Sequence, residues 1–393
     1  MAAPRLPLSE PRASVDNHLL ALTGLRIFPA LAVYLSHIGT PHGAPAWLDR
    51  ALSSGYYGVT VFFVLSGFVL TINYWDRLQR PTRGALWSYA VARFARIYPL
   101  YAAVLVYVAF KAKIDTGTVS PSWPWHLAGL QAWLPNSLNV VGFGPGWSIS
   151  VELFLYATLP LLILGLRPLA SVRRLIAAAL LTIGVLLAVA AWFDYERGGL
   201  SIEDTASAHR WLYVTPAARL GDFLLGIFAA RLYVQLRASD RAAAVGAALA
   251  AASVVVIVFF TTQSWMYLSA YSWDVAYAVP AVLLIIGLAL SPRAPLSRIC
   301  ALPAIVFLGE ASYALYLIHA SIAVGFGASS WTAITSKSSL GLEALSLGLV
   351  MATAIGLHIA IERPARVFLR NLLDRKHPSP APAVPVPAPL YYG

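Results

Sequence analysis

The chain has 393 residues and a formal net charge of +11; 59% of its residues are apolar and only 11% are charged. Soluble proteins contain about 45–50% apolar and about 25% charged residues, so with a mean hydropathy of +0.70 this composition excludes a water-soluble globule. It predicts a polytopic membrane protein, in which the positive charge marks cytoplasmic loops and not a nucleic-acid partner. A single cysteine, Cys300, excludes an internal disulfide and multi-cysteine metal sites.

Ten apolar stretches are long enough to cross a hydrocarbon core of about 30 Å, which needs about 20 helical residues. They are roughly residues 19–38, 57–73, 88–110, 147–165, 173–193, 212–233, 241–261, 273–290, 303–325 and 340–361. The sequence therefore predicts an all-α bundle of about ten transmembrane helices. The aromatic stretch 121–135 is too short and too rich in proline to span, and we expect it to be interfacial or re-entrant.

Loop charges predict the topology. Loops after even-numbered spans carry the excess of arginine, which places both termini in the cytoplasm of a plasma (inner) membrane protein. We expect a cytoplasmic tail over 1–18, a membrane domain over 19–370 and a proline-rich tail over 371–393. A cleaved signal peptide is the alternative for the first span, but Arg26 and His37 interrupt its apolar stretch.

Arg26 and His37 are eleven residues apart in the first span. At about 100° per residue they return to within about 20° of the same face, about 16 Å apart along the axis. We expect both to face one interior cavity, with Arg26 nearer the cytoplasm. In the alternative, His37 contacts headgroups and Arg26 extends toward the interface.

Three further ionisable positions stand out because charges inside a membrane are costly and are often functional. Glu152 lies one turn inside the outer end of the fourth span, with Ser148 on its face, and His37 would be a natural partner at that depth. Arg93 and Arg96 lie on one face at the cytoplasmic end of the third span. Guanidinium pairs suit phosphate oxygens, although anchoring of the span also explains them.

The remaining polar positions lie in later spans. In the sixth span, Arg219 and Asp222 form an i,i+3 pair that can neutralise itself. In the ninth, Tyr316 and His319 share a face with Ser312, whereas Glu310 points away toward the cytoplasmic side. At the end of the tenth span, Glu362 is expected to cap the helix or pair with cytoplasmic arginines, a structural role.

In chain order these segments resemble the acyltransferase-3 family of integral-membrane O-acyltransferases, over roughly residues 19–370. The resemblance rests on Arg26 with His37, GVTVFFVLSGFVLT (58–71), Arg93-x-x-Arg96, WSISVELFLY around Glu152, ARLGDFLLGIFA, SYALYLIH and Glu362-Arg363-Pro364. Asp222 stands where many members have Glu, which preserves the charge. The resemblance implies a minimal single-domain form with a ten-helix core.

The resemblance implies transfer of an acyl group, commonly acetyl, from acyl-CoA (acetyl-CoA) to a hydroxyl of a carbohydrate or of a glycosylated or polyketide (macrolide-like) product. A thioester is already activated, so the acceptor mainly needs a general base, which His37 can supply while Glu152 holds its tautomer. His37 could instead carry the acyl group itself. We expect a lipid bilayer around the protein, no nucleic-acid partner and no metal. The residues expected to bind acyl-CoA are Arg26, Arg93 and Arg96, and those expected to bind substrate are Ser148, Arg219, Asp222, Tyr313, Tyr316 and His319.

The competing class is a secondary transporter or a flippase for a lipid-linked sugar, which would use the same buried charges for coupling. A transporter would release no free CoA from acetyl-CoA, whereas an acyltransferase would. The sequence alone leaves the acceptor open.

Overall fold

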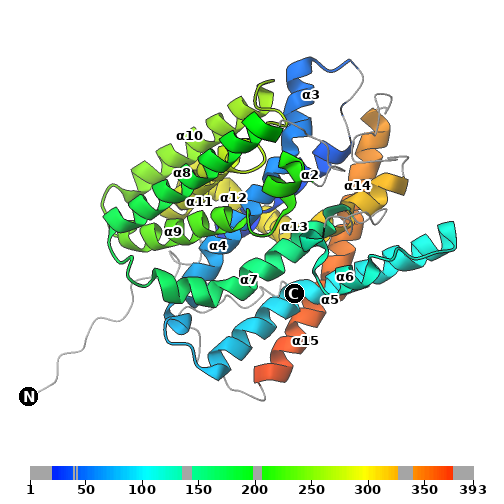
Figure 1. Cartoon of the computed structure of the whole chain (residues 1–393), viewed down its shortest axis with the longest axis horizontal. Coiled ribbons are helices and arrows are strands. Elements are labelled where there is room, and N and C mark those ends of the chain that lie inside the picture. The colour runs from blue at the N-terminus through cyan, green and yellow to red at the C-terminus, as the bar shows by residue number, and fades with distance from the viewer. Residues whose placement is uncertain are drawn as a thin grey trace, which may run out of the picture.

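A computed structural model describes residues 20–38, 40, 43–134, 144–197, 206–325 and 340–374, which are helical and contain no strand (Figure 1). The α-helices are α2 (Ile27–Ile38), α3 (Ala46–Ser53), α4 (Tyr57–Leu78), α5 (Arg83–Thr116), α6 (Trp123–Leu127), α7 (Trp147–Leu166), α8 (Val172–Arg197), α9 (Leu220–Leu236), α10 (Ala242–Thr262), α11 (Val275–Leu290), α12 (Pro295–Cys300), α13 (Pro303–Gly325), α14 (Leu340–Leu357) and α15 (Arg363–Asp374). Short 3-10 turns η1 (Ser54–Tyr56), η2 (Gln131–Trp133) and η3 (Gly144–Gly146) and π-helical turns η4 (His209–Val214) and η5 (His358–Glu362) connect them.

The predicted all-α membrane bundle is confirmed. Within the described residues, eight helical stretches are long and apolar enough to cross a membrane: 20–38, 46–78, 83–116, 144–166, 172–195, 242–262, 303–322 and 343–369. The predicted sixth and eighth spans contain α9 and α11, of 17 and 16 residues, which fall short of that length. The stretch from 121 forms only α6 and η2, both too short to span.

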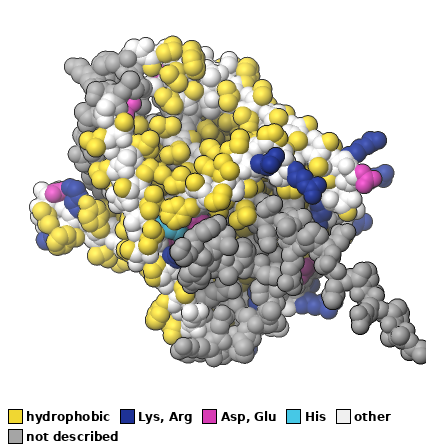
Figure 2. Space-filling view, turned by 180° about the vertical axis from the view of Figure 1, so that it is seen from behind, with side chains coloured by type: hydrophobic (Ala, Val, Ile, Leu, Met, Phe, Trp, Pro, Cys, Tyr) yellow, Lys and Arg dark blue, Asp and Glu magenta, His cyan; other side chains and the backbone are white. Residues whose placement is uncertain are grey.

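The surface of the bundle matches a lipid environment. Hydrophobic side chains cover much of the described surface in Figure 2, whereas the visible Lys and Arg side chains lie mainly toward its edges. Large apolar side chains are strongly exposed on α8 and α10, for example Leu181 and Val255 at 70% and 68%. Surfaces of this kind are stable in contact with hydrocarbon and not with water.

Glycines bring the central helices α4 and α9 into close contact. A Cβ added to Gly67 would lie 2.3 Å from the carbonyl oxygen of Phe223, and one added to Gly226 would lie 2.1 Å from that of Val64. Small residues allow such backbone approach, which is how membrane helices associate where apolar surface alone gives no driving force. Gly67 and Gly226 therefore permit the close crossing of α4 and α9.

The first span is broken where it carries its arginine. Residues 20–25 are helical, Arg26 lies in a turn and α2 begins at the next residue. Beside this break, α13 crosses the first span so closely that a Cβ on Gly309 would lie 2.0 Å from the Thr23 carbonyl oxygen. The crossing holds the polar residues of α13 next to Arg26.

The last helices pack against the basic end of α5. The chain passes from α14 through the π-helical turn η5 into α15, and α15 lies against α5 (Figure 1). Helix α15 ends at Asp374, four residues past the expected end of the membrane domain at 370. The predicted tail over 1–18 and most of the tail over 371–393 lie outside the described residues.

Candidate active site

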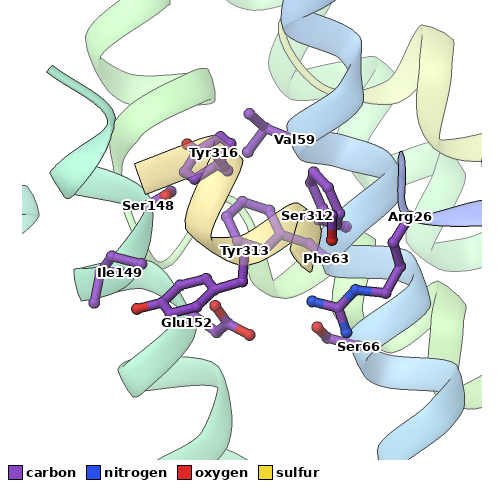
Figure 3. Close-up of a pocket in the computed structure, with 11 residues that line it drawn as sticks. Arg26, Val59, Phe63, Ser66, Ser148, Ile149, Glu152, Ser312, Tyr313 and Tyr316 are labelled. Carbon is purple, nitrogen blue, oxygen red and sulfur yellow. The ribbon is translucent and has the colours of Figure 1, made fainter. Parts of the chain in front are cut away.

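A cavity inside the bundle gathers side chains from the first span, α4, α7 and α13. It contains about 430 Å³ of space free of protein atoms and is lined by Arg26, Val59, Phe62, Phe63, Ser66, Ser148, Ile149, Glu152, Ser312, Tyr313 and Tyr316. Five of the predicted site residues, from three separate spans, therefore meet in one place: Arg26, Ser148, Glu152, Tyr313 and Tyr316 (Figure 3).

Arg26 and Glu152 enter the cavity from opposite sides. Figure 3 shows the guanidinium of Arg26 reaching in from the first span and the carboxylate of Glu152 from α7. The guanidinium carbon lies 5.8 Å from the ring centroid of Phe62, a cation–π distance, and Glu152 accepts a hydrogen bond from the hydroxyl of Tyr156, one turn later. The cavity thus combines an oriented carboxylate with a facing cation.

The start of α7 sets the position of Glu152. The hydroxyl of Ser148 donates to the carbonyl oxygen of Pro145 at 2.9 Å, and the amide of Gln131 donates to that of Gly146 at 2.5 Å. These bonds fix the turn that leads into the helix. Ser148 was expected to bind substrate; its hydroxyl faces the cavity and also holds this turn.

The two arginines of α5 lie beside aromatic side chains of the cavity wall. Arg93 donates to the hydroxyl of Tyr74 at 3.2 Å, and its guanidinium carbon is 5.7 Å from the ring centroid of Tyr156, the residue that donates to Glu152. The guanidinium carbon of Arg96 is 5.6 Å from the ring centroid of Tyr313, which lines the cavity. Arg96 therefore lies next to the cavity wall, and Arg93 lies next to the residue that donates to Glu152.

Glu362 holds Arg96 in place. This buried carboxylate forms an ion pair with Arg96, as expected from the sequence, and it also contacts Nδ1 of His358 at 3.0 Å. The Nε2 atom of His358 in turn lies 3.8 Å from a carboxylate oxygen of Glu310. Sequence reasoning missed His358, although its i,i+4 spacing from Glu362 was a usable signal.

His37 lies beyond the cavity and meets a second imidazole. Its ring centroid is 4.9 Å from that of His319, with the ring planes at 69°, and His319 follows the cavity residue Tyr316 by about one turn of α13. The sequence favoured Glu152 as the partner of His37. In the structure Glu152 instead lines the cavity with Arg26 and accepts a hydrogen bond from Tyr156.

Arg219 and Asp222 form a separate buried cluster. Arg219 donates to Asp222 at 2.9 Å and to the carbonyl oxygen of Tyr213 at 2.8 Å, and it lies 3.8 Å from Asp274, a partner that the sequence did not indicate. Its guanidinium carbon is 5.9 Å from the ring centroid of Phe63, whose side chain lines the cavity. The pair therefore lies behind the cavity wall, and its role in binding substrate stays a prediction.

These groups form a series of neighbours, here called the polar column. Arg96 lies beside the cavity residue Tyr313, and Arg26 and Glu152 face each other in the cavity. The ring of His319, which contacts that of His37, lies 5.8 Å from the ring of the cavity residue Tyr316. Within the described part of the chain, no group of three or more His, Cys, Asp and Glu side chains is arranged to hold a metal ion. The column provides cations for an anionic ligand at one end and imidazoles for proton transfer at the other.

Comparison with known proteins places this geometry in a family. Residues 19–361 match the model of the acyltransferase domain. The chain is 32% identical over 397 residues to acyltransferase MdmB of Streptomyces mycarofaciens, covering 93% of this chain and 96% of that protein. It is 22% identical over 335 residues to O-acetyltransferase OatA of Staphylococcus aureus, covering 78% of this chain and 51% of that protein. No solved structure matches.

Proposed function

The chain belongs to the acyltransferase family whose domain model it matches over residues 19–361, and from this we propose that it moves an acyl group, in the simplest case acetyl, from acyl-CoA to a hydroxyl of an acceptor. The observation that carries the proposal is the polar column, in which Arg96, the cavity residues Arg26 and Glu152, and the imidazoles of His319 and His37 lie in one series of neighbours.

The donor enters at the basic end. CoA carries phosphates, and two guanidinium groups bind phosphate oxygens well because the planar fork forms two parallel hydrogen bonds. Arg96 lies over the ring of the cavity residue Tyr313, and Arg93 lies over the ring of Tyr156, the hydrogen-bond donor to Glu152. The extended pantetheine arm then runs past Arg26 toward the far end of the column.

The base is His37. Its Nδ1 atom lies 2.7 Å from the carbonyl oxygen of Val33, and because a carbonyl only accepts, Nδ1 carries the hydrogen and Nε2 carries the lone pair. Nε2 removes the proton of the acceptor hydroxyl as its oxygen attacks the thioester carbon, and the same proton passes to the departing CoA sulfur. Attack by Nε2 itself would instead give an acyl-histidine intermediate.

The acceptor is a carbohydrate or a glycosylated or polyketide (macrolide-like) product. The O-acetyltransferase among the relatives supports transfer to oxygen, and the apolar multi-pass bundle supports a location in the cell's plasma (inner) membrane. The competing function, transport or flipping of a lipid-linked sugar, uses no thioester. Turnover of acetyl-CoA therefore separates the two.

The test uses membranes that contain the chain and acetyl-CoA labelled in the acetyl group. We expect label in an acceptor and one free CoA for each acetyl transferred, and we expect His37→Ala to lose at least 100-fold in rate, since a general base contributes about 10²–10⁴-fold. The variant should keep its elution volume and melting temperature in detergent. A variant that retains more than a tenth of the wild-type kcat would remove both roles assigned to His37.

A further inference from the structure

The fully buried His319 has a hydrogen-bonding capacity that its surroundings do not use. Its side chain is 0% exposed, and its Nδ1 atom lies 2.6 Å from the carbonyl oxygen of Tyr316. The other ring nitrogen, Nε2, is buried without a hydrogen-bond partner among the described residues. A buried polar atom without a partner costs free energy, so an apolar ring at this position would be more stable unless the nitrogen has a use.

The two imidazoles are oriented in the same way. The Nδ1 atoms of His37 and His319 each lie against a backbone carbonyl oxygen, of Val33 and Tyr316 respectively. Because carbonyl oxygens do not donate, both Nδ1 atoms carry hydrogen, and both rings keep their lone pair on Nε2. With ring centroids 4.9 Å apart, the two imidazoles are close enough for a positive charge on one ring to interact with the other.

We propose that His37 and His319 work as one unit that holds a single proton, with His319 as a positioning residue for His37. This inference rests on the proposed acyl transfer. As the acceptor oxygen bonds to the thioester carbon, its proton moves to Nε2 of His37; the lone pair of His319 stabilises the resulting imidazolium; the carbon–sulfur bond breaks and the proton passes to sulfur. His319 itself gains and loses nothing, so the atoms and electrons balance.

The stabilisation has a simple physical origin. A cation in a low-dielectric interior is costly, and a neutral imidazole whose lone pair faces it lowers that cost much as a hydrogen-bond acceptor does. The ring also fixes the orientation of His37 by its edge-to-face contact. A purely structural role would need only the shape of the ring, whereas the proposed role also needs its nitrogen.

Two variants of the full-length protein in proteoliposomes separate shape from nitrogen. His319→Gln retains an accepting oxygen, whereas His319→Phe retains only a ring. With labelled acetyl-CoA and membrane-extracted acceptor, we expect His319→Phe to lower kcat about 100-fold, with His319→Gln at least tenfold more active than His319→Phe. The KM for acetyl-CoA should stay within about twofold of wild type in both, because acyl-CoA phosphates bind at the other end of the column.

Chemical rescue gives a second measurement that does not depend on how the larger side chains pack. His319→Ala leaves a space that imidazole or pyrrole can fill, and pyrrole has the same shape without an accepting nitrogen. We expect imidazole to restore at least ten times more rate than pyrrole. Equal effects of the two compounds, including no effect of either, would overturn the inference while leaving acyl transfer by the wild type intact. Absence of transfer by the wild type would instead reject the proposed function itself.

Discussion

At the scale of single residues, the negative charge of Glu152 compensates the positive charge of Arg26 in the cavity, and this sets how strongly the cavity would attract the proposed anionic donor. Its carboxylate faces Arg26 and accepts from Tyr156. Glu152 is half-buried at the start of an apolar helix, where opposite charges interact more strongly than they do in water. The pair therefore keeps the cavity close to neutral when no donor is bound.

We expect Glu152→Gln to lower kcat by about 10- to 100-fold, because the facing charge disappears while the side-chain shape and an oxygen for the Tyr156 hydroxyl remain. The KM for acetyl-CoA should stay the same or fall, since Arg26 would then be uncompensated and would attract CoA more strongly. Steady-state kinetics in proteoliposomes would measure both constants. Asp115→Asn, at an exposed ion pair with Lys111, serves as the control for loss of a carboxylate. A lower melting temperature with unchanged kcat would make Glu152 a structural residue.

The sequence predicted which residues are special better than it predicted their partners. Arg26, Glu152, Tyr313 and Tyr316 do meet in one cavity, because helical periodicity fixes the face of each span. The contact between His37 and His319 depends instead on the relative depth of two spans that are distant in sequence. Contacts across helices carry no local signal, so periodicity alone could not find them.

At the scale of helices, the crossing of α4 and α9 depends on Gly67 and Gly226. Helix α4 supplies residues that line the cavity, and α9 begins directly after the buried Arg219. Their backbones approach so closely that even a methyl group at either glycine would meet a carbonyl oxygen. Phe63 lies between the cavity and the Arg219 cluster, so the helix crossing sets the distance between these two sites.

We expect Gly226→Ala to destabilise the bundle by about 1–3 kcal/mol, because overpacking forces the helices apart. Thermal unfolding in detergent, followed by the loss of the monodisperse peak in gel filtration, would show a lower melting temperature. Gly184→Ala in α8 is the matched control, since nothing lies within 4 Å of its added Cβ, and alanine favours helix by up to about 1 kcal/mol. Equal melting temperatures for the two variants would contradict the close crossing.

The existence of each helix was easier to predict from the sequence than its length. Hydropathy found a helix in each of the ten segments, because a span must satisfy its backbone hydrogen bonds internally and cover itself with apolar side chains. It extended the sixth segment back to residue 212, where the structure has the π-helical turn η4 and then a break before α9. Arg219 lies in that break and contacts Tyr213 of η4 and Asp222 of α9, and hydropathy does not register such buried polar contacts.

At the scale of the whole molecule, the polar column gives the protein two chemically different ends. The basic end at Arg93 and Arg96 suits CoA, which is plentiful in the cytoplasm, and loop charges predict that this end faces inward. The same prediction places the imidazole end on the outer side, where the proposed acceptor would bind.

This orientation can be measured by labelling single cysteines. The native Cys300 is only 1% exposed and can be replaced by serine. In intact spheroplasts we expect a membrane-impermeant maleimide to label Thr118→Cys, in the exposed loop after α5, and to label Ser171→Cys, in the exposed loop before α8, only after permeabilisation. The reverse pattern would place the CoA-binding end outside the cell and would require another donor.

The charge of Arg26 also has an electrical consequence. A column of titratable groups through an energised membrane invites a proton leak, and each elementary charge that crosses gains about 2.3 kcal/mol per 100 mV. A fixed guanidinium in the middle of such a path repels protons, as arginines do in water channels. Because the guanidinium of Arg26 reaches into the cavity, the charge that can face an anionic donor would also oppose the passage of protons through the bundle.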